Sequence, residues 1–300
     1  MTDRKPEPLL IFASGQRTGS TLLQRFILSN PRIMVWGEHD GVLGKVLKQM
    51  ERLYDWDSMF AHELEAFIDT GYNNFVPCMI PPANIIQDTQ RAVLETLYRE
   101  PALRMGRDIW GFKEVLYRAD VAVRLRELYP NLKVLYITRH PFNCFVSILN
   151  EERLKPYEVV TMPLEESWTR KRTIDWITDW ADINESFLDN PHLNDEWVFR
   201  LTFEQLVADP VSTTARIADW LGMAQSEFDM GVFSHRLYAS RNNGQPNKRD
   251  TRAKITWEDL SIEESLLITQ PRLREVAERA GYHLPELIHE KRMFRHEDLF

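Results

Sequence analysis

The segment from Leu9 to Leu23 constrains the fold of this chain more than any other part. Residues 9–13 form an apolar run typical of a buried strand, which breaks at Ser14 and Gly15. Apolar residues then return with helical spacing and stop before Pro31. A strand that passes through a glycine turn into a helix N-terminus binds anions, because backbone N–H groups and the helix dipole face the turn. We therefore expect a phosphorylated ligand here.

The residues of this turn indicate which phosphate group it binds. Gly15 and Gly19 allow the backbone to approach a phosphate closely, but their spacing is one residue too short for a Walker A loop. Ser20 stands where the Walker lysine belongs, so the fixed cation is Arg17, whose fork suits a single phosphate or a phosphosulfate. The hydroxyl donors of the turn are Thr18, Ser20 and Thr21.

Residues 16–23, Gln-Arg-Thr-Gly-Ser-Thr-Leu-Leu, resemble the 5′-phosphosulfate loop of the sulfotransferases that use 3′-phosphoadenosine 5′-phosphosulfate (PAPS). The arginine form is that of carbohydrate and tyrosylprotein sulfotransferases, whereas the cytosolic aryl sulfotransferases carry a lysine. The resemblance implies a donor-binding loop made of Ser14, Gly15, Gln16, Arg17, Thr18, Gly19, Ser20 and Thr21.

A second element resembles the 3′-phosphate unit of the same family. The apolar run 133–138 ends at Arg139, Pro141 follows two residues on, and Ser147 lies on the next predicted helix. A strand-end arginine and a serine on the second turn of the following helix can converge on one phosphate. The alternative for Arg139 alone is an ion pair with a carboxylate.

Two further segments supply candidate catalytic residues. Lys113 follows a short strand and matches the family lysine that stabilises charge on the leaving phosphate; the alternative is a strand-end lysine that extends to solvent. Glu38 matches the proposed general base of tyrosylprotein and some bacterial carbohydrate sulfotransferases, with His39 as the competing base. The histidine of the cytosolic enzymes is replaced here by Val115. Asp40 or Glu38 could instead cap a helix over 41–53.

The C-terminal third resembles the family less specifically. Residues 196–222 read as a strand, an acidic turn, Asp-Pro and a helix that ends in Leu-Gly, with Gln205 in place of the usual aspartate. A basic loop over 241–254 is expected either to close over the nucleotide or to be a solvated charged loop, and Ser240 and Arg241 are candidate cofactor-binding residues. The tail 284–300 could support a homodimer.

The pattern of elements predicts an α/β fold with a P-loop-like, mainly parallel sheet flanked by helices. Strands are expected near 8–13, 109–114, 133–138 and 196–202, and a helical insertion over about 41–104 is expected to shape the acceptor site. We expect residues 1–300 to form a single sulfotransferase domain. A long helix over 164–189 carries an apolar stripe that predicts core packing: Trp176, Trp180, Ile183 and Phe187.

The composition of the chain limits the classes of binding partner that we expect. The net charge of −8 disfavours nucleic acid or an anionic membrane surface as a partner. Cys78 and Cys144 are too few for a disulfide framework, and the chain shows no signal peptide, membrane-spanning run or metal-ligand cluster. These features favour a cytoplasmic protein without a metal.

The resemblance therefore implies an enzyme that moves a sulfonyl group from PAPS, with PAP as product, to a hydroxyl or amine. The acceptor is expected to be a small molecule, a carbohydrate or a peptide. Two alternatives remain: a kinase that uses ATP and magnesium, and a non-catalytic nucleotide-binding protein of the same fold. The kinase should show a Walker lysine and a magnesium-binding aspartate, and neither is evident.

Overall fold

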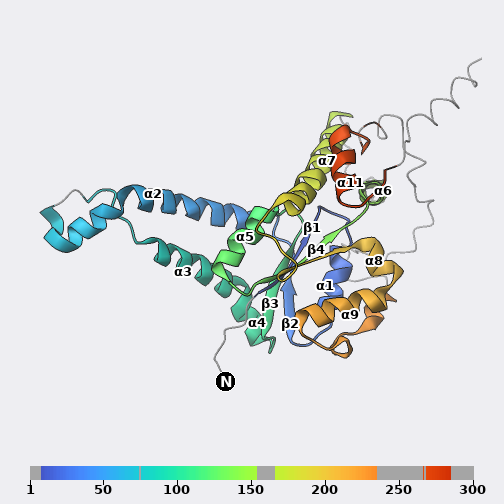
Figure 1. Cartoon of the computed structure of the whole chain (residues 1–300), viewed down its shortest axis with the longest axis horizontal. Coiled ribbons are helices and arrows are strands. Elements are labelled where there is room, and N and C mark those ends of the chain that lie inside the picture. Colours follow the sequence, from blue (N-terminus) through green and yellow to red (C-terminus); the bar gives the residue numbers. More distant parts are fainter. Residues whose placement is uncertain (1–7, 74–75, 154–165, 235–265, 267, 285–300) are drawn as a thin grey trace, which may run out of the picture.

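A five-stranded, all-parallel sheet forms the centre of the computed structural model (Figure 1). The structure describes residues 8–73, 76–153, 166–234, 266 and 268–284. The strands are β1 (Leu9–Ala13), β2 (Ile33–Trp36), β3 (Ile109–Glu114), β4 (Lys133–Thr138) and β5 (Val198–Thr202), and their order across the sheet is β2-β3-β1-β4-β5.

The helices come between and after the strands, as the sequence pattern predicts. They are α1 (Ser20–Leu28), α2 (Val42–Thr70), α3 (Ala83–Leu94), α4 (Glu100–Arg104), α5 (Ala119–Leu128), α6 (Pro141–Arg153), α7 (Glu166–Asp189), α8 (Phe203–Ala208), α9 (Pro210–Leu221) and α11 (Pro271–Arg279). Shorter turns are η1 (Gly71–Asn73), the π-helical η2 (Glu95–Arg99), η3 (Gln225–Glu227) and η4 (Met230–Phe233).

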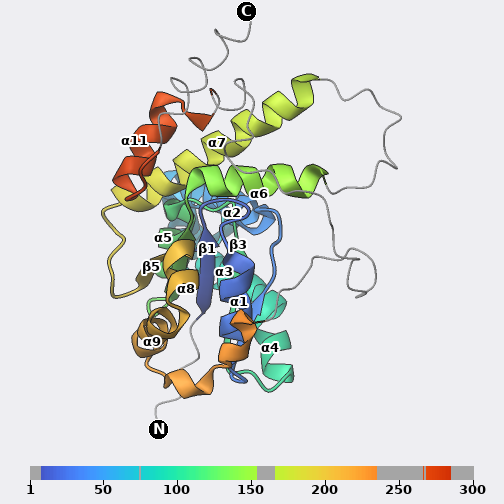
Figure 2. The ribbon, with the colours of Figure 1, turned by 90° about the vertical axis from the view of Figure 1, so that its right-hand side faces the viewer.

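The alternation of side chains along β1 builds a core on each face of the sheet. Leu10 and Phe12 pack with buried residues of α2, α5 and α7. Leu9, Ile11 and Ala13 pack on the other face with α1, α8 and α9. A third cluster joins α6, α7 and α11, and α6 and α7 lie across the end of the sheet where β1 and β4 finish (Figure 2). All five residues of β1 are buried, as expected for a central parallel strand.

The fold confirms the expected α/β class and the four expected strands, and it adds β2. Among the described strands, this four-residue edge strand pairs with β3, with Val35 opposite Gly111, and it is too short to stand out from the sequence. Its effect is to bring the segment after Trp36 to the same sheet edge as the end of β3.

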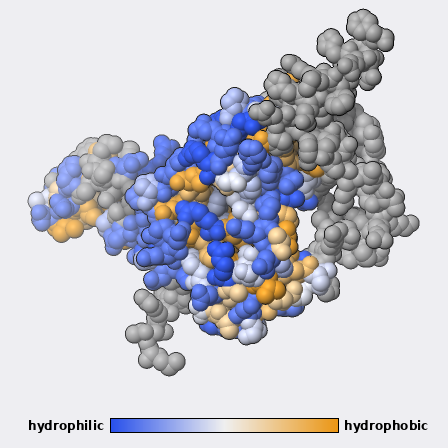
Figure 3. All heavy atoms as spheres, turned by 45° about the vertical axis from the view of Figure 1, so that its right-hand side comes forward, coloured by the Kyte–Doolittle hydropathy of each residue, from blue (hydrophilic) through white to orange (hydrophobic). Residues whose placement is uncertain are grey.

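The residues between β2 and β3 form mostly helices. α2 and α3 extend together from the sheet as an arm (Figure 1). α2 ends at Thr70, and Gly71, with a positive φ of 72°, is its C-cap. The face of the molecule in Figure 3 has hydrophilic areas with apolar patches between them. Exposed large hydrophobic side chains include Ile68 and Tyr72, at the end of α2 and in η1.

Gly111 is required by close packing rather than by a turn. A Cβ added at this position would lie 1.7 Å from the carbonyl oxygen of Leu9, a backbone atom that cannot rotate away. We therefore expect Gly111→Ala to push β3 away from β1 and to lower the free energy of unfolding by about 3 kcal/mol, measured by urea titration. Gly37→Ala is the matched control, because a Cβ there meets nothing within 4 Å. Equal stability of the two variants would contradict this packing.

Candidate active site

The loop between β1 and α1 is an open anion cradle at the carboxyl end of the central strand. Gly15 and Gly19 adopt positive φ angles of 97° and 89°, and Gly19 occupies the N-cap of α1 without a side-chain cap. The hydrogen bonds formed by the described residues leave the backbone N–H groups of Gly19, Ser20 and Thr21 open. These groups are therefore available to an anion, with the helix dipole behind them.

The remaining loop residues divide into a supporting set and an exposed set. Ser14, Thr18 and Ser20 are buried, and the Thr18 hydroxyl donates to the Gly15 carbonyl at 3.1 Å, which closes the turn. Gln16 and Thr21 are exposed. The buried hydroxyls thus shape the loop, while the exposed residues face outward.

Arg139 and Ser147, which were expected to converge on one phosphate, both contact Arg17. Arg17 Nε donates to Ser147 Oγ at 3.1 Å, and Arg139 Nη1 donates to the Arg17 carbonyl at 2.9 Å. Arg17 holds a positive φ of 66°, an uncommon conformation for a residue with a side chain. Elements 122 to 130 residues apart in sequence therefore meet at one side of the loop.

Phe203 completes this corner and was not predicted from the sequence. Its ring lies against Gly19, where an added Cβ would come within 2.1 Å of the ring, and the Arg139 guanidinium stacks on it at 4.4 Å from the ring centre. The first residue of α8 thus sets the position of Arg139. An aromatic residue after a strand is common, so no sequence signal marks it.

Glu38 and Lys113 form an ion pair on the β3 side of the loop. Lys113 Nζ donates to Glu38 Oε1; the lysine side chain is 5% exposed and the glutamate side chain is 43% exposed. Lys113 therefore does not extend to solvent. The pair places a carboxylate that solvent can reach beside a buried ammonium group.

Glu114, which the sequence analysis did not single out, holds the segment that carries Glu38. Its carboxylate is fully buried and accepts three backbone N–H groups: Oε2 from Gly41 at 2.9 Å and from His39 at 3.3 Å, and Oε1 from Val115 at 2.7 Å. A buried carboxylate is stable when N–H groups satisfy it in this way. Glu114 thus fixes the backbone next to Glu38.

His39 is engaged on both ring nitrogens. Nε2 lies 2.6 Å from the Tyr117 hydroxyl and Nδ1 lies 3.3 Å from the Tyr98 hydroxyl. Burial lowers the pKa of His39 below its usual value, and this effect outweighs the opposing influence of the Glu114 and Glu38 carboxylates. Burial thus disfavours the charged form of His39, and both ring nitrogens are hydrogen-bonded.

The possibility that Asp40 or Glu38 caps the helix after the site is wrong. α2 begins at Val42, and its N-cap is Gly41, with no side-chain cap. Asp40 and Gly41 have φ angles of 55° and 66°, so the chain turns through two left-handed residues before the helix. The bonds from His39 and Gly41 to Glu114 hold this turn in place.

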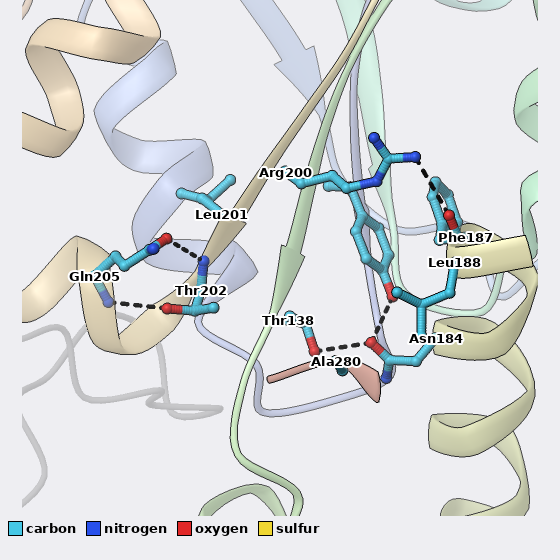
Figure 4. A pocket seen from close by; sticks show the side chains of 10 residues that line it. Thr138, Asn184, Phe187, Leu188, Arg200, Leu201, Thr202, Gln205 and Ala280 are labelled. Carbon is cyan, nitrogen blue, oxygen red and sulfur yellow. Dashed lines mark hydrogen bonds between the residues drawn. The ribbon is translucent and has the colours of Figure 1, made fainter. Parts of the chain in front are cut away.

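Behind the loop, a buried hydrogen-bond chain links β1, β4 and α7. Ser14 Oγ donates to Thr138 Oγ1 at 2.9 Å, and Thr138 Oγ1 and Tyr136 Oη both donate to Asn184 Oδ1, at 3.0 and 2.9 Å. Part of this chain lines a cavity of about 180 Å³ beside β5 (Figure 4). The chain fixes the first residue of the loop relative to α7.

Ser240, Arg241 and the basic loop 241–254 lie outside the described residues, as do residues 285–300 of the tail. Within the described part of the chain, no group of three or more His, Cys, Asp or Glu residues could hold a metal ion. None of the described helices combines the length and apolar composition that a bilayer span requires.

Comparison with known proteins identifies the family to which this sequence is similar. The model of the sulfotransferase family matches residues 8–227. A sulfotransferase domain from the olefin synthase of Synechococcus PCC 7002 is 19% identical, with a TM-score of 0.50 over 95% of this chain and 98% of that chain. A sulfotransferase domain from the curacin biosynthetic pathway is 18% identical, with a TM-score of 0.49 over 94% of this chain and 100% of that one. Among curated proteins, no sequence matches this chain.

The likeness to the olefin synthase domain concerns the fold, which is the parallel sheet and helices described above. The family match concerns the sequence and runs from β1 to beyond β5, so it includes the anion loop, Glu38, Lys113 and Arg139. The chain therefore belongs to the sulfotransferase family.

Proposed function

We propose that this sulfotransferase takes its sulfonyl group from PAPS and transfers it to a hydroxyl or amine group of a small-molecule, carbohydrate or peptide acceptor. The observation that carries the proposal is the convergence of two anion-binding elements. The open N–H groups at the start of α1 lie on the same loop as Arg17, which contacts both Arg139 and Ser147. A ligand with two phosphate-type groups, as in PAPS and PAP, suits this arrangement.

The residues present fit such a ligand. Nε of Arg139 is buried and has no partner among the described residues, so the guanidinium retains a donor for an anion. Among the described residues, a Cβ at Gly15 would come within 4 Å of only the indole nitrogen of Trp176, at 3.8 Å, so none of their side chains fills the start of the loop. We assign the 5′-phosphosulfate to the loop 14–21 and the 3′-phosphate to Arg139 and Ser147.

PAPS, when bound, supplies the sulfonyl group that is transferred. Glu38 accepts the proton of the acceptor hydroxyl, because it is the solvent-accessible carboxylate beside the loop. Lys113 and Arg17 supply positive charge for the oxygen that leaves, and their electrostatic effect is strong because Lys113 is nearly buried. Much of the catalysis is then positioning.

Glu38 suits the base role better than His39. A general base needs a free acceptor directed toward the substrate, and both ring nitrogens of His39 already contact tyrosine hydroxyls. Glu38 contacts Lys113 and keeps much of its side chain accessible. We assign the acceptor site to the side of the arm, because the first turn of α2 lies beside this segment: Gly44 N–H and His39 Nε2 both contact the Tyr117 hydroxyl.

The choice of nucleotide gives the first test. We expect PAP to bind with the same affinity in the presence of EDTA and of magnesium, and ATP to bind at least tenfold more weakly, because the loop lacks the Walker lysine. Calorimetric titration measures both. Magnesium-dependent ATP hydrolysis that PAP does not inhibit would show the kinase alternative to be correct.

A substitution of Arg139 tests the assignment of the 3′-phosphate separately from that of the 5′-phosphate. Arg139→Ala should weaken PAP binding by about 2 kcal/mol, through loss of a charge-assisted fork, and should weaken binding of adenosine 5′-phosphate much less. Arg32→Ala is the control, because Arg32 pairs with Asp108 at the start of β2. An equal loss of affinity for both nucleotides would show that Arg139 does not bind the 3′-phosphate.

The base is tested by Glu38→Gln, which keeps size and most hydrogen bonding but cannot take up the proton. Turnover of labelled PAPS with a responsive hydroxyl acceptor should fall by roughly 10²-fold or more, while PAP affinity stays near wild type. His39→Gln should lower thermal stability and reduce turnover far less. The roles are reversed if His39→Gln abolishes turnover and Glu38→Gln remains active.

A further inference from the structure

The indole nitrogen of Trp176, on α7, lies against the start of the anion loop without a hydrogen-bond partner. Nε1 is buried, and the described residues offer it no acceptor. A Cβ on Gly15 would lie 3.8 Å from it, so this N–H stands directly beside the first glycine of the loop. Trp176 was expected to belong to the core stripe of its helix; its partly buried side chain packs against the third cluster.

In the next two turns of α7, side chains form hydrogen bonds with β4 and with the residue that follows it. Trp180, which is fully buried, donates its indole N–H to the carbonyl of Arg139 at 3.2 Å. Asn184 accepts from Tyr136 and Thr138 (Figure 4). Trp180 and Asn184, four and eight residues after Trp176, thus make three hydrogen bonds to the end of β4 and to the residue after it, and these bonds set where Trp176 lies.

The same helix is also braced against α6. The rings of Trp176 and Phe145 lie 6.0 Å apart, and α6 carries Ser147, the partner of Arg17. The indole is therefore held on one side by a helix that already contributes to the loop, and its N–H faces Gly15 on the other.

A buried indole N–H normally finds an acceptor. The loop carries no side chain at Gly15, and its own carbonyl there accepts from Thr18. The acceptor that suits this place is an oxygen of an anion bound in the loop, because charged oxygens accept strong hydrogen bonds from neutral N–H donors.

We propose that Trp176 is a donor-binding residue whose indole N–H donates to a phosphate or sulfonate oxygen of the phosphosulfate group of PAPS. This inference rests on the proposed function. It adds Trp176, on α7, to the loop, Arg139 and Ser147 as residues that contact the nucleotide. It also gives α7 a direct role in ligand binding beyond its packing.

Trp176→Phe tests the inference, because it keeps an aromatic ring and removes only the N–H side of the indole. The matched control is Trp220→Phe, since Trp220 donates its N–H to the Asp195 carbonyl and lies near Lys133, at the opposite end of β4. Calorimetric titration with PAP and with PAPS, in the absence of acceptor, measures binding without turnover. Thermal unfolding checks that each variant is folded.

Wild type and Trp220→Phe should bind alike, and Trp176→Phe should bind PAPS at least tenfold more weakly. A parallel loss for PAP places the bond on the 5′-phosphate, whereas a loss for PAPS alone places it on the sulfonyl group. Unchanged PAPS affinity in a folded Trp176→Phe variant overturns the inference and leaves the proposed function intact. Failure of the wild type to bind either nucleotide would instead refute the proposed function.

A second measurement uses the wild-type protein, so it stands even if Trp176→Phe does not fold. The nine tryptophans give separate indole N–H signals in a proton–nitrogen NMR spectrum, and Trp176→His or selective labelling assigns the one that matters. We expect this signal to move downfield and to exchange more slowly with solvent when PAPS is added. A signal that does not respond to saturating PAPS contradicts the inference.

Discussion

The position of β1 between β3 and β4 is the constraint on which the site depends. All five of its residues are buried, and both neighbours run parallel to it, so three strands end at the same edge of the sheet. The loop after β1 is thereby flanked by Lys113 from β3 on one side and by Arg139 after β4 on the other. Gly111 allows the close approach of β3 that this order requires.

Different kinds of side chain line the two sides of the loop. This difference fits the two tasks of sulfonyl transfer, which are to bind the donor and to accept a proton. On the β4 side, the contacts involve arginines, a hydroxyl and an aromatic ring, which are groups that bind and orient anions. On the β3 side, the buried Glu114 holds the backbone while Lys113 and Glu38 remain paired above it. The first arrangement suits the donor, and the second suits a proton acceptor beside the reacting group.

The sequence predicts the parts of this site that come from local pattern. The strands at 9–13 and 133–138 are apolar runs and 109–114 is a short strand pattern. The loop directly follows the first run, Arg139 directly follows 133–138, and Ser147 lies on the next helix. It does not predict β2, the buried position of Glu114, the position of Phe203 against Gly19 or that of the Trp176 indole beside Gly15. A four-residue edge strand has little pattern of its own, and the other three owe their roles to contacts between distant segments: Glu114 with 39–41, Phe203 with Gly19, and Trp176 with Gly15. Gln205 illustrates the same limit, because its departure from the family aspartate is accommodated by a capping box with Thr202.

A crystal structure with PAP bound tests the central claim most directly, because it locates both phosphates at once. We expect the 5′-phosphate at the backbone N–H groups of Gly19 to Thr21, and the 3′-phosphate within hydrogen-bond distance of Arg139 and Ser147. Nucleotide bound elsewhere, for example in the cavity beside β5 (Figure 4), or with its 3′-phosphate distant from Arg139, would contradict it.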